Sequence, residues 1–149
     1  MKIRAINKGI DEELFNEIIE MNESTPYHRL LDIEISMLDK GIAEITTTIQ
    51  EKHLNPVGNA HGGMLFSLFD TALGMAVRTM GRYNITSLDM DMNFIAPAKP
   101  GDTLTVTGKV VHLGRSTAVS EGEAYNQDGK LIAKSRETFF NFGLMTSVE

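Results

Sequence analysis

The stretch NPVGNAHGGMLFSLFD, residues 55–70, decides the fold, because a polar turn leads directly into an apolar helix. From about Gly62 to Met80 the residues are largely apolar on every side, as is typical of a helix enclosed by protein. We therefore expect a central helix over residues 62–80. Asp70 is its only acid, and the residues one turn away offer no basic partner. An unpaired buried carboxylate is costly, so Asp70 is a candidate functional residue; the alternative is an acid that reaches water or a backbone donor.

Three glycines, Gly58, Gly62 and Gly63, surround His61 in the turn and allow backbone conformations that other residues avoid. They also let the first amide groups of the helix approach a ligand with no Cβ in the way. A helix N-terminus of this kind can bind an oxyanion or a phosphate. A Gly-Gly pair beside a His is by itself typical of an ordinary helix entry, and only its combination with Asp70 favours a site.

Helix geometry separates His61 from Asp70. If the helix begins near Gly62, Asp70 lies more than two turns further on, roughly 12 Å along the axis and on the side opposite His61. One chain cannot easily bring both groups to one atom. Unless the helix is broken, a shared site therefore requires a second copy of the chain, and the spacing predicts a two-fold symmetric dimer with composite sites.

Hydrophobic periodicity predicts one further helix and six strands. An amphipathic helix is expected over residues 11–23, opened by Asp11 and lying against the outside of the molecule. The strands are expected at residues 31–37, 42–50, 87–94, 103–112, 116–125 and 130–142. An antiparallel sheet curled around the apolar helix satisfies this order, which is an α+β fold in a single domain over residues 1–149.

Two of these strands carry further information. In residues 87–94, alternation assigns Ser87 and Asp89 to a polar face and Leu88 and Met90 to an apolar one. In residues 116–125, small side chains share one face, which predicts a smooth surface that a helix can approach closely.

Composition excludes several function classes. The chain has 149 residues, of which 42% are hydrophobic, and a formal charge of −6 with no basic stripe, which argues against a nucleic-acid surface. The absence of cysteine excludes disulfides and thiolate catalysis and fits a reducing cytoplasm. The four histidines show no paired ligand spacing, so no metal is expected. Asp70 and Arg78 argue against a membrane span in the central helix, and the first residues lack the apolar core of a signal peptide.

A larger pattern links these features. Asn55, its spacing to His61-Gly62-Gly63, Asp70, the segment SLDMDMNF at residues 87–94 and the segment APAKPGD at residues 96–102 resemble a hotdog-fold acyl-CoA thioesterase of the phenylacetyl-CoA thioesterase type. The resemblance runs from about Leu30 to Phe142. It implies a hotdog fold, hydrolysis of an acyl-CoA to free acid and coenzyme A, and no cofactor beyond the coenzyme A of the substrate. We expect a homodimer with shared sites and a dimer of dimers, a homotetramer, as the larger assembly.

The resemblance also implies roles for single residues. No Gly-x-Ser-x-Gly elbow occurs, so Asp70 must supply the activation, either as general base or as nucleophile. The Gly62 amide would stabilise the oxyanion, and the Asn55 amide would bind the same thioester group. His61 either shapes the helix N-terminus or contacts the thioester.

Five further residues follow from the same resemblance. Ser87 matches a hydroxyl that holds the attacking water, and the alternative for it is a solvent-facing serine. Gly63, Lys99, Arg115 and Ser116 are candidates for binding coenzyme A, although each cation could equally be a solvated surface charge.

Two other functions remain open on the same fold. A non-catalytic acyl-CoA sensor would have no use for Asp70. A hotdog dehydratase would need a His and an acid arranged for proton transfer at carbon.

Overall fold

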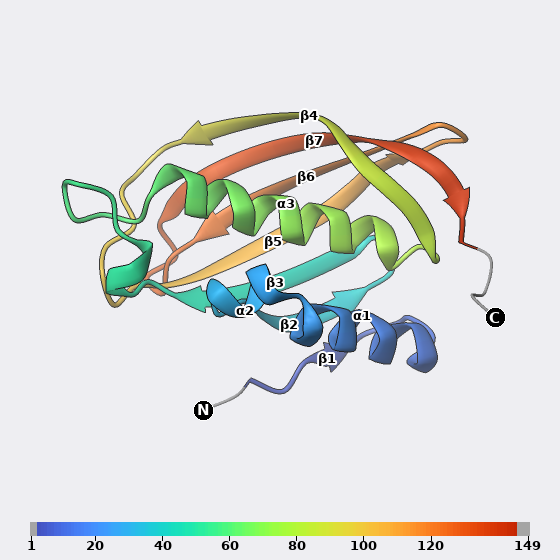
Figure 1. Ribbon diagram of the computed structural model, residues 1–149, viewed down its shortest axis with the longest axis horizontal. Coiled ribbons are helices and arrows are strands. Elements are labelled where there is room, and N and C mark those ends of the chain that lie inside the picture. Colours follow the sequence, from blue (N-terminus) through green and yellow to red (C-terminus); the bar gives the residue numbers. More distant parts are fainter. Residues whose placement is uncertain (1–2, 146–149) are drawn as a thin grey trace.

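The computed structural model describes residues 3–145, which form one curved sheet around a long helix (Figure 1). The elements are β1 (Ile6–Asn7), α1 (Glu12–Ser24), α2 (Pro26–Leu30), β2 (Glu34–Asp39), β3 (Ile42–Thr48), the 3-10 helix η1 (Glu51–His53), α3 (Gly62–Arg78), β4 (Tyr83–Phe94), β5 (Thr103–Leu113), β6 (Thr117–Tyr125) and β7 (Leu131–Leu144). The strand order is β1-β2-β3-β5-β6-β7-β4, and only the β1–β2 pair is parallel. The predicted α+β fold, with the sheet curved around the central helix, is confirmed.

The differences from the predicted elements are confined to short segments and element ends. β1, α2 and η1 were not predicted, because two to five residues are too few to show a period. The central helix ends at Arg78 rather than Met80, and β4 begins at Tyr83. α1 begins after Asp11 as expected, with Asp11 Oδ2 accepting a hydrogen bond from the Leu14 amide at 3.2 Å. No helix within residues 3–145 is long and apolar enough to cross a membrane.

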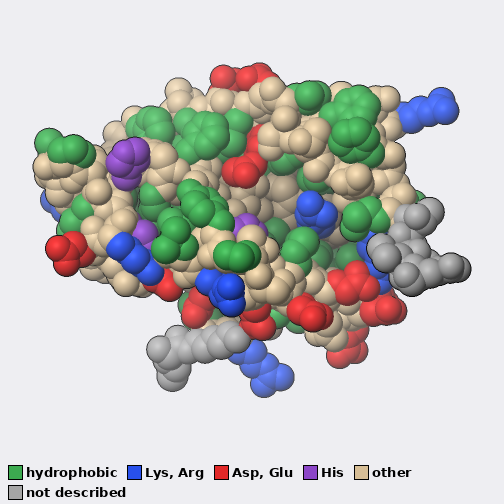
Figure 2. Space-filling model, viewed as in Figure 1, with side chains coloured by type: hydrophobic (Ala, Val, Ile, Leu, Met, Phe, Trp, Pro, Cys, Tyr) green, Lys and Arg blue, Asp and Glu red, His purple; other side chains and the backbone are tan. Residues whose placement is uncertain are grey.

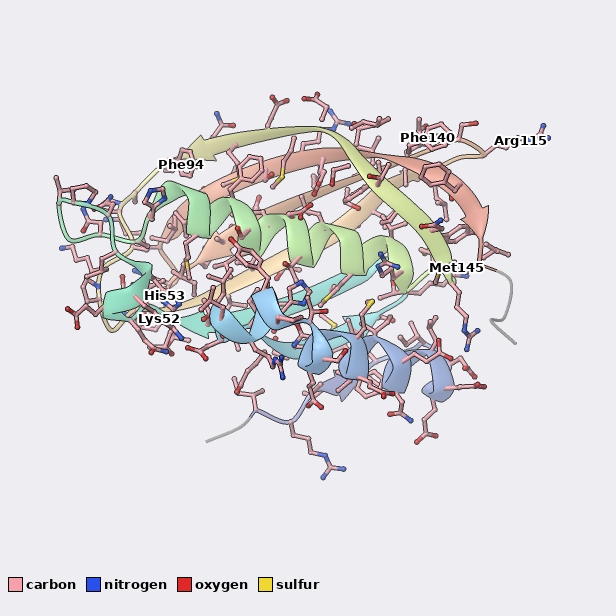
Figure 3. All side chains as sticks on the ribbon, viewed as in Figure 1. Lys52, His53, Phe94, Arg115, Phe140 and Met145 are labelled. Carbon is pink, nitrogen blue, oxygen red and sulfur yellow. The ribbon has the colours of Figure 1, made fainter. Side chains whose placement is uncertain are left out.

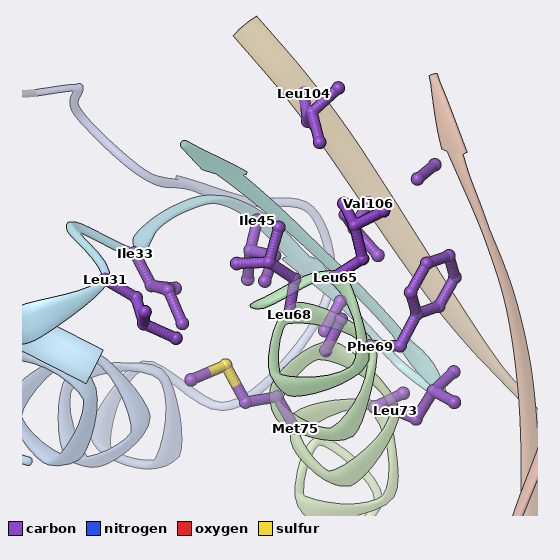
Figure 4. Packing of buried hydrophobic residues seen from close by; sticks show 14 of the residues in the cluster. Leu31, Ile33, Ile45, Leu65, Leu68, Phe69, Leu73, Met75, Leu104 and Val106 are labelled. Carbon is purple, nitrogen blue, oxygen red and sulfur yellow. The ribbon is translucent and has the colours of Figure 1, made fainter. Parts of the chain in front are cut away.

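One face of α3 fills the concave side of the sheet. Figure 4 shows side chains of α3 packed against those of β3 and β5. The residues that make this contact are all at most 4% exposed: Leu65, Leu68, Phe69 and Leu73 from α3, Ile45 from β3, and Leu104 and Val106 from β5. Burial of these side chains is the main apolar stabilisation of the fold.

Glycines let the helix approach the sheet closely. A Cβ at Gly108 of β5 would lie 2.8 Å from the Ala72 carbonyl oxygen of α3, and a Cβ at Gly122 of β6 would lie 3.1 Å from Leu73 Cδ2. Ala118 and Ala124 on the same face of β6 are fully buried. The predicted smooth face of this strand is therefore confirmed, with α3 as the helix that approaches it.

The opposite side of α3 is not enclosed, which corrects the sequence interpretation. Gly63, Phe66 and Asp70 are exposed, Phe66 by 40%, and Gly74 and Arg78 are only partly buried. These residues recur at helical spacing and form an open stripe along α3. The expectation of a buried Asp70 is wrong for a single chain, because the sheet covers only one side of the helix.

A β-bulge changes the face assignment in β4. The pairing with β7 passes from Ser87–Phe139 to Asp89–Thr138, which leaves Leu88 without a partner. Ser87 therefore turns towards α3, on the same face as Met90, while Leu88 is 58% exposed. The predicted placement of Ser87 on the same face as Asp89, and of Leu88 on the same face as Met90, is wrong, because the extra residue interrupts strict alternation.

The close approach of α3 predicts the effect of adding one methyl group. Gly108→Ala should lower the free energy of unfolding by about 1–3 kcal/mol, because the new Cβ meets a backbone oxygen that cannot move aside. Gly74→Ala is the matched control: its Cβ would lie 3.9 Å from the Phe139 ring, an ordinary contact, and Ala favours the helix. Urea unfolding of both variants measures the difference; equal stability of the two would contradict the close packing.

Candidate functional site

Asp70 faces a hollow of about 340 Å³ on the open side of α3. The hollow lies between α2, α3, β4 and β7, and its polar lining includes Thr25, His28, Asp70, Thr71, Arg78, Thr86 and Ser87. Asp70 thus meets polar groups from elements that are distant in the sequence, rather than the apolar surroundings that its own helix predicts.

Ser87 connects two carboxyl groups. Its Oγ lies 3.2 Å from Asp70 Oδ1 and 2.7 Å from Glu137 Oε1 of β7. The bulge at Leu88 positions Ser87 for both contacts. The candidate Ser87 is therefore next to Asp70 in the same chain.

Glu137 is the most buried acid of this group, with 1% of its surface exposed. Burial is the main cause that raises the pKa of Glu137, and hydrogen bonding with Asp70 and its negative charge raise it further; together they bring it to about 9, although the contact with Ser87 lowers it. At neutral pH, Glu137 therefore carries a proton.

Two basic groups complete the hollow. His28 Nε2 lies 3.5 Å from Thr71 Oγ1; burial lowers the pKa of His28, and the charge of Asp70 partly opposes this. Burial also lowers the pKa of Arg78, whose guanidinium donates a hydrogen bond to the Tyr83 carbonyl oxygen at 3.4 Å.

The N-terminus of α3 borders a second hollow of about 330 Å³. Asn55, Asn59, Gly62, Leu65, and residues 94–98 line it. Within residues 3–145, no group accepts a hydrogen bond from the Gly62 amide. Phe94 lies over this first turn (Figure 3), and a Cβ at Gly62 would come within 3.3 Å of its ring. Glycine thus leaves the amide accessible next to the aromatic ring.

Asn55 and His61 stabilise the backbone around this hollow through hydrogen bonds to main-chain amides. Asn55 Oδ1 accepts hydrogen bonds from the Val57 and Asn59 amides, both at 3.1 Å. In the described chain its Nδ2 group has no acceptor, so the amide hydrogens remain for a ligand. His61 caps α3, because its Nδ1 accepts a hydrogen bond from the Gly63 amide at 2.8 Å.

The predicted residues therefore divide into two groups. Asn55, Gly62 and His61 lie at the start of α3, and the Ala98 that precedes Lys99 lines the same hollow. Asp70 and Ser87 lie in the other hollow, and no residue lines both. Figure 3 shows Arg115 at the end of the molecule opposite Phe94, so Arg115 and Ser116 are far from the start of α3 in one chain. Lys99, Arg115 and Ser116 are exposed.

Sequence reasoning missed His28 and Glu137. A signal for Glu137 existed, because alternation in residues 133–139 separates Ala133, Ser135, Glu137 and Phe139 from the exposed Lys134 and Arg136. An acid on the core-facing side of a strand is a candidate site residue. His28 gave no such signal, since α2 is too short for a period and its contact with Thr71 spans 43 positions.

Comparison with known proteins identifies the family. A family model described as Thioesterase superfamily matches residues 57–133. Acyl-coenzyme A thioesterase PaaI of Escherichia coli is 38% identical over 116 residues, which cover 78% of this chain and 82% of that protein. This chain belongs to the thioesterase superfamily. The predicted resemblance to a hotdog-fold thioesterase of this type is confirmed.

Solved structures of the superfamily have the same fold. The E. coli PaaI protein from the phenylacetic acid degradation operon superposes with a TM-score of 0.85 at 32% identity, over 92% of this chain and 99% of that one. A hypothetical thioesterase from Streptococcus pneumoniae with coenzyme A has a TM-score of 0.74 at 35% identity, over 76% of this chain and 88% of that one. The family segment contains Gly62, Asp70 and Ser87, whereas Asn55 and Glu137 lie outside it.

Protonation of Glu137 predicts how stability depends on pH. Its pKa is higher in the folded state, about 9, than its ordinary value of 4.5, so folding takes up a proton between these values. The contribution to stability is complete below about pH 4.5 and is lost as the pH rises towards 9. Glu137→Gln should remove this dependence, which is at most about 1.4 kcal/mol per pH unit.

Urea unfolding of wild type and Glu137→Gln between about pH 5 and about pH 8 measures the effect. Glu20→Gln, at an exposed position of α1, is the matched control and should keep the slope of the wild type. Parallel stability curves for wild type and Glu137→Gln would show that Glu137 is ionised in the folded protein.

Proposed function

We propose that this protein is an acyl-CoA thioesterase that hydrolyses an acyl-CoA to a free acid and coenzyme A, with Asp70 as the reacting acid. Asp70 carries the proposal: it is an exposed carboxylate at a polar hollow, next to the Ser87 hydroxyl at 3.2 Å. The E. coli relative is named an acyl-coenzyme A thioesterase, which supports the substrate class. No cofactor takes part, and the absence of cysteine favours a cytoplasmic location.

Two routes are chemically open to Asp70. As a general base it takes a proton from a water molecule, whose oxygen attacks the thioester carbonyl carbon; the tetrahedral intermediate then expels the thiolate of coenzyme A. As a nucleophile it attacks the carbonyl carbon itself, expels the thiolate and forms an anhydride that water cleaves. In the first route Ser87 accepts or donates a hydrogen bond that holds the water near Asp70.

The start of α3 supplies the complementary groups. The Gly62 amide and Asn55 Nδ2 are hydrogen-bond donors without acceptors in the described chain, and both border one hollow. Donors of this kind stabilise the oxyanion that develops on the thioester carbonyl. His61 contributes through its cap, which fixes the backbone around Gly62 and Gly63.

A dimer unites these two halves. β4 is the last strand of the sheet and pairs only with β7 in the described chain, so a 12-residue edge is free to pair. Figure 2 shows hydrophobic side chains gathered along this edge, where Leu88 and Phe94 are 58% and 57% exposed. A second copy at this edge would cover the open stripe of α3 and bring one chain's Gly62 towards the other chain's Asp70. A dimer of dimers is the larger assembly that we propose.

The same dimer would place basic side chains where they can bind the phosphates of coenzyme A. Lys99 follows Ala98, which lines the hollow at Gly62, and Arg115 lies at the end of the molecule opposite Phe94. Two chains that share a site can therefore offer Lys99 of one copy and Arg115 of the other to the phosphates. The Streptococcus pneumoniae relative that was solved with coenzyme A supports this ligand class.

Asp70→Asn tests the reaction. The amide is nearly isosteric with the carboxylate but can act neither as base nor as nucleophile, so kcat should fall by at least about a hundredfold. Free-thiol release from a panel of acyl-CoAs measures the effect and separates hydrolysis from sensing or dehydration, which release no thiol. Asp128→Asn, at an exposed position in the turn between β6 and β7, is the matched control and should retain activity. Wild-type turnover by Asp70→Asn, with deamidation excluded by mass spectrometry, would refute the role of Asp70.

Complementation tests the shared site. Gly62→Pro removes the amide hydrogen at the first helical position, where proline is well accepted. A heterodimer of Asp70→Asn with Gly62→Pro contains one doubly damaged site and one intact site. It should show about half the activity of the wild-type dimer, while either variant alone is inactive.

Asn55→Asp serves as the second variant of the α3 start. It keeps the acceptor oxygen for the Val57 and Asn59 amides and removes the Nδ2 donors. Heterodimers are isolated with two different affinity tags and assayed for thiol release. A lack of rescue in verified heterodimers, or a fully active monomer in light scattering, would rule out the shared site.

A further inference from the structure

Glu137 is a buried acid with incomplete hydrogen bonding at the edge of the Asp70 site. Its side chain is 1% exposed, Oε1 contacts the Ser87 hydroxyl, and Oε2 has no hydrogen-bond partner among residues 3–145. Burying a carboxyl group with an unpaired oxygen lowers the stability of the fold, so such a group is a candidate for a functional role. The general reaction proposed above uses Asp70 and Ser87 but gives no role to Glu137.

The single hydroxyl hydrogen of Ser87 limits which of the two neighbouring acids, Asp70 and Glu137, can be ionised at the same time. Ser87 Oγ carries one hydrogen and lies 2.7 Å from Glu137 Oε1 and 3.2 Å from Asp70 Oδ1. If both acids were ionised, one of the two contacts would contain no hydrogen, and two negative charges would face each other. If Glu137 is neutral, its O–H donates to Ser87 Oγ and the Ser87 O–H donates to Asp70. Each contact then has its own hydrogen.

We propose that Glu137 is a positioning residue for hydrolysis: as a neutral carboxylic acid it donates a hydrogen bond to Ser87 and thereby turns the Ser87 hydroxyl towards Asp70. This inference rests on the proposed thioesterase function. The proton stays on Glu137, no covalent bond forms or breaks there, and Asp70 keeps the negative charge that a base or nucleophile needs. Glu137 itself does not touch the reacting atoms.

The surroundings of Glu137 hold its proton in place. From α3 the charged group that faces it is Asp70, with Arg78 further along the same hollow, and from α2 the titratable group is His28. Its cross-strand neighbours in the register are the uncharged Ser120 of β6 and Met90 of β4. Burial and the nearby charge of Asp70 both raise the pKa of Glu137, to about 9.

Ionisation of Glu137 should therefore end the alignment at alkaline pH. Two neighbouring carboxylates then compete for the single Ser87 hydrogen, and Ser87 no longer points towards Asp70. Above about pH 9, kcat of the wild type should fall, with a limiting slope of about tenfold per pH unit, while KM changes little.

The test is the pH profile of kcat in wild type, Glu137→Gln and Glu121→Gln, measured by chromatography of the acid product. Glutamine keeps a donor for Ser87 but cannot ionise, so Glu137→Gln should lose the alkaline fall. Glu121 is exposed on β6, and Glu121→Gln should keep both the wild-type activity and the fall. An unchanged alkaline fall in Glu137→Gln would overturn the proposal.

Infrared spectroscopy tests the proton independently of activity. Protein with ¹³C-labelled glutamate should show a protonated glutamic acid carbonyl band at neutral pH that disappears as the pH passes about 9. The band should be missing in Glu137→Gln, and its absence from the wild type would overturn the proposal even if the variant failed to fold. A wild type with the band but without thiol release from any acyl-CoA would refute the proposed function and, with it, the role of Glu137 in hydrolysis, while leaving its proton established.

Discussion

Close contact between α3 and the sheet at Gly108 and Gly122 fixes which side of α3 faces the core and which side carries the candidate site. Because these residues have no side chain, the helix lies directly on β5 and β6 and buries Leu73 completely. One side of α3 is then committed to the core, and the opposite side, with Asp70, is left open. The site depends on this rotation of the helix, since a few tens of degrees would move Asp70 away from β4 and β7.

The open side gains its polar character from other elements. The bulge at Leu88 turns Ser87 of β4 towards Asp70. Glu137 lies on β7 and His28 on α2. Each contributes one polar group to the surroundings of Asp70. A proton on Glu137 lets the two acids lie close together with a single negative charge, and the burial of Glu137 favours this neutral form.

The division of the site between two hollows links function to assembly. The donors at Gly62 and Asn55 lie at the start of α3, and the acid lies two turns further along it on another side. A rigid helix cannot bend its own ends together. Within residues 3–145 the outer edge of β4 pairs with no strand, and the proposed two-fold contact at this edge would bury apolar surface and bring the two groups of residues together.

The sequence by itself determined the features that depend on local period and spacing. The 3.6-residue pattern of α3, the alternation of the strands and the turn glycines predict the sheet around a helix, and the motif from Asn55 to Asp70 predicts the family. These follow from short-range constraints that each residue imposes on its own segment. The separation of His61 from Asp70 belongs to the same group, because helix geometry is fixed.

Tertiary structure alone decided which side of α3 stays open, how the bulge turns Ser87, and that Glu137 and His28 meet Asp70. The contacts between Ser87 and Glu137, and between His28 and Thr71, span 50 and 43 positions, and no local pattern encodes which strand face meets which helix face. A single extra residue at Leu88 reverses the outcome of alternation. The burial and the raised pKa of Glu137 depend on the residues packed around it, so they exist only once distant segments have come together.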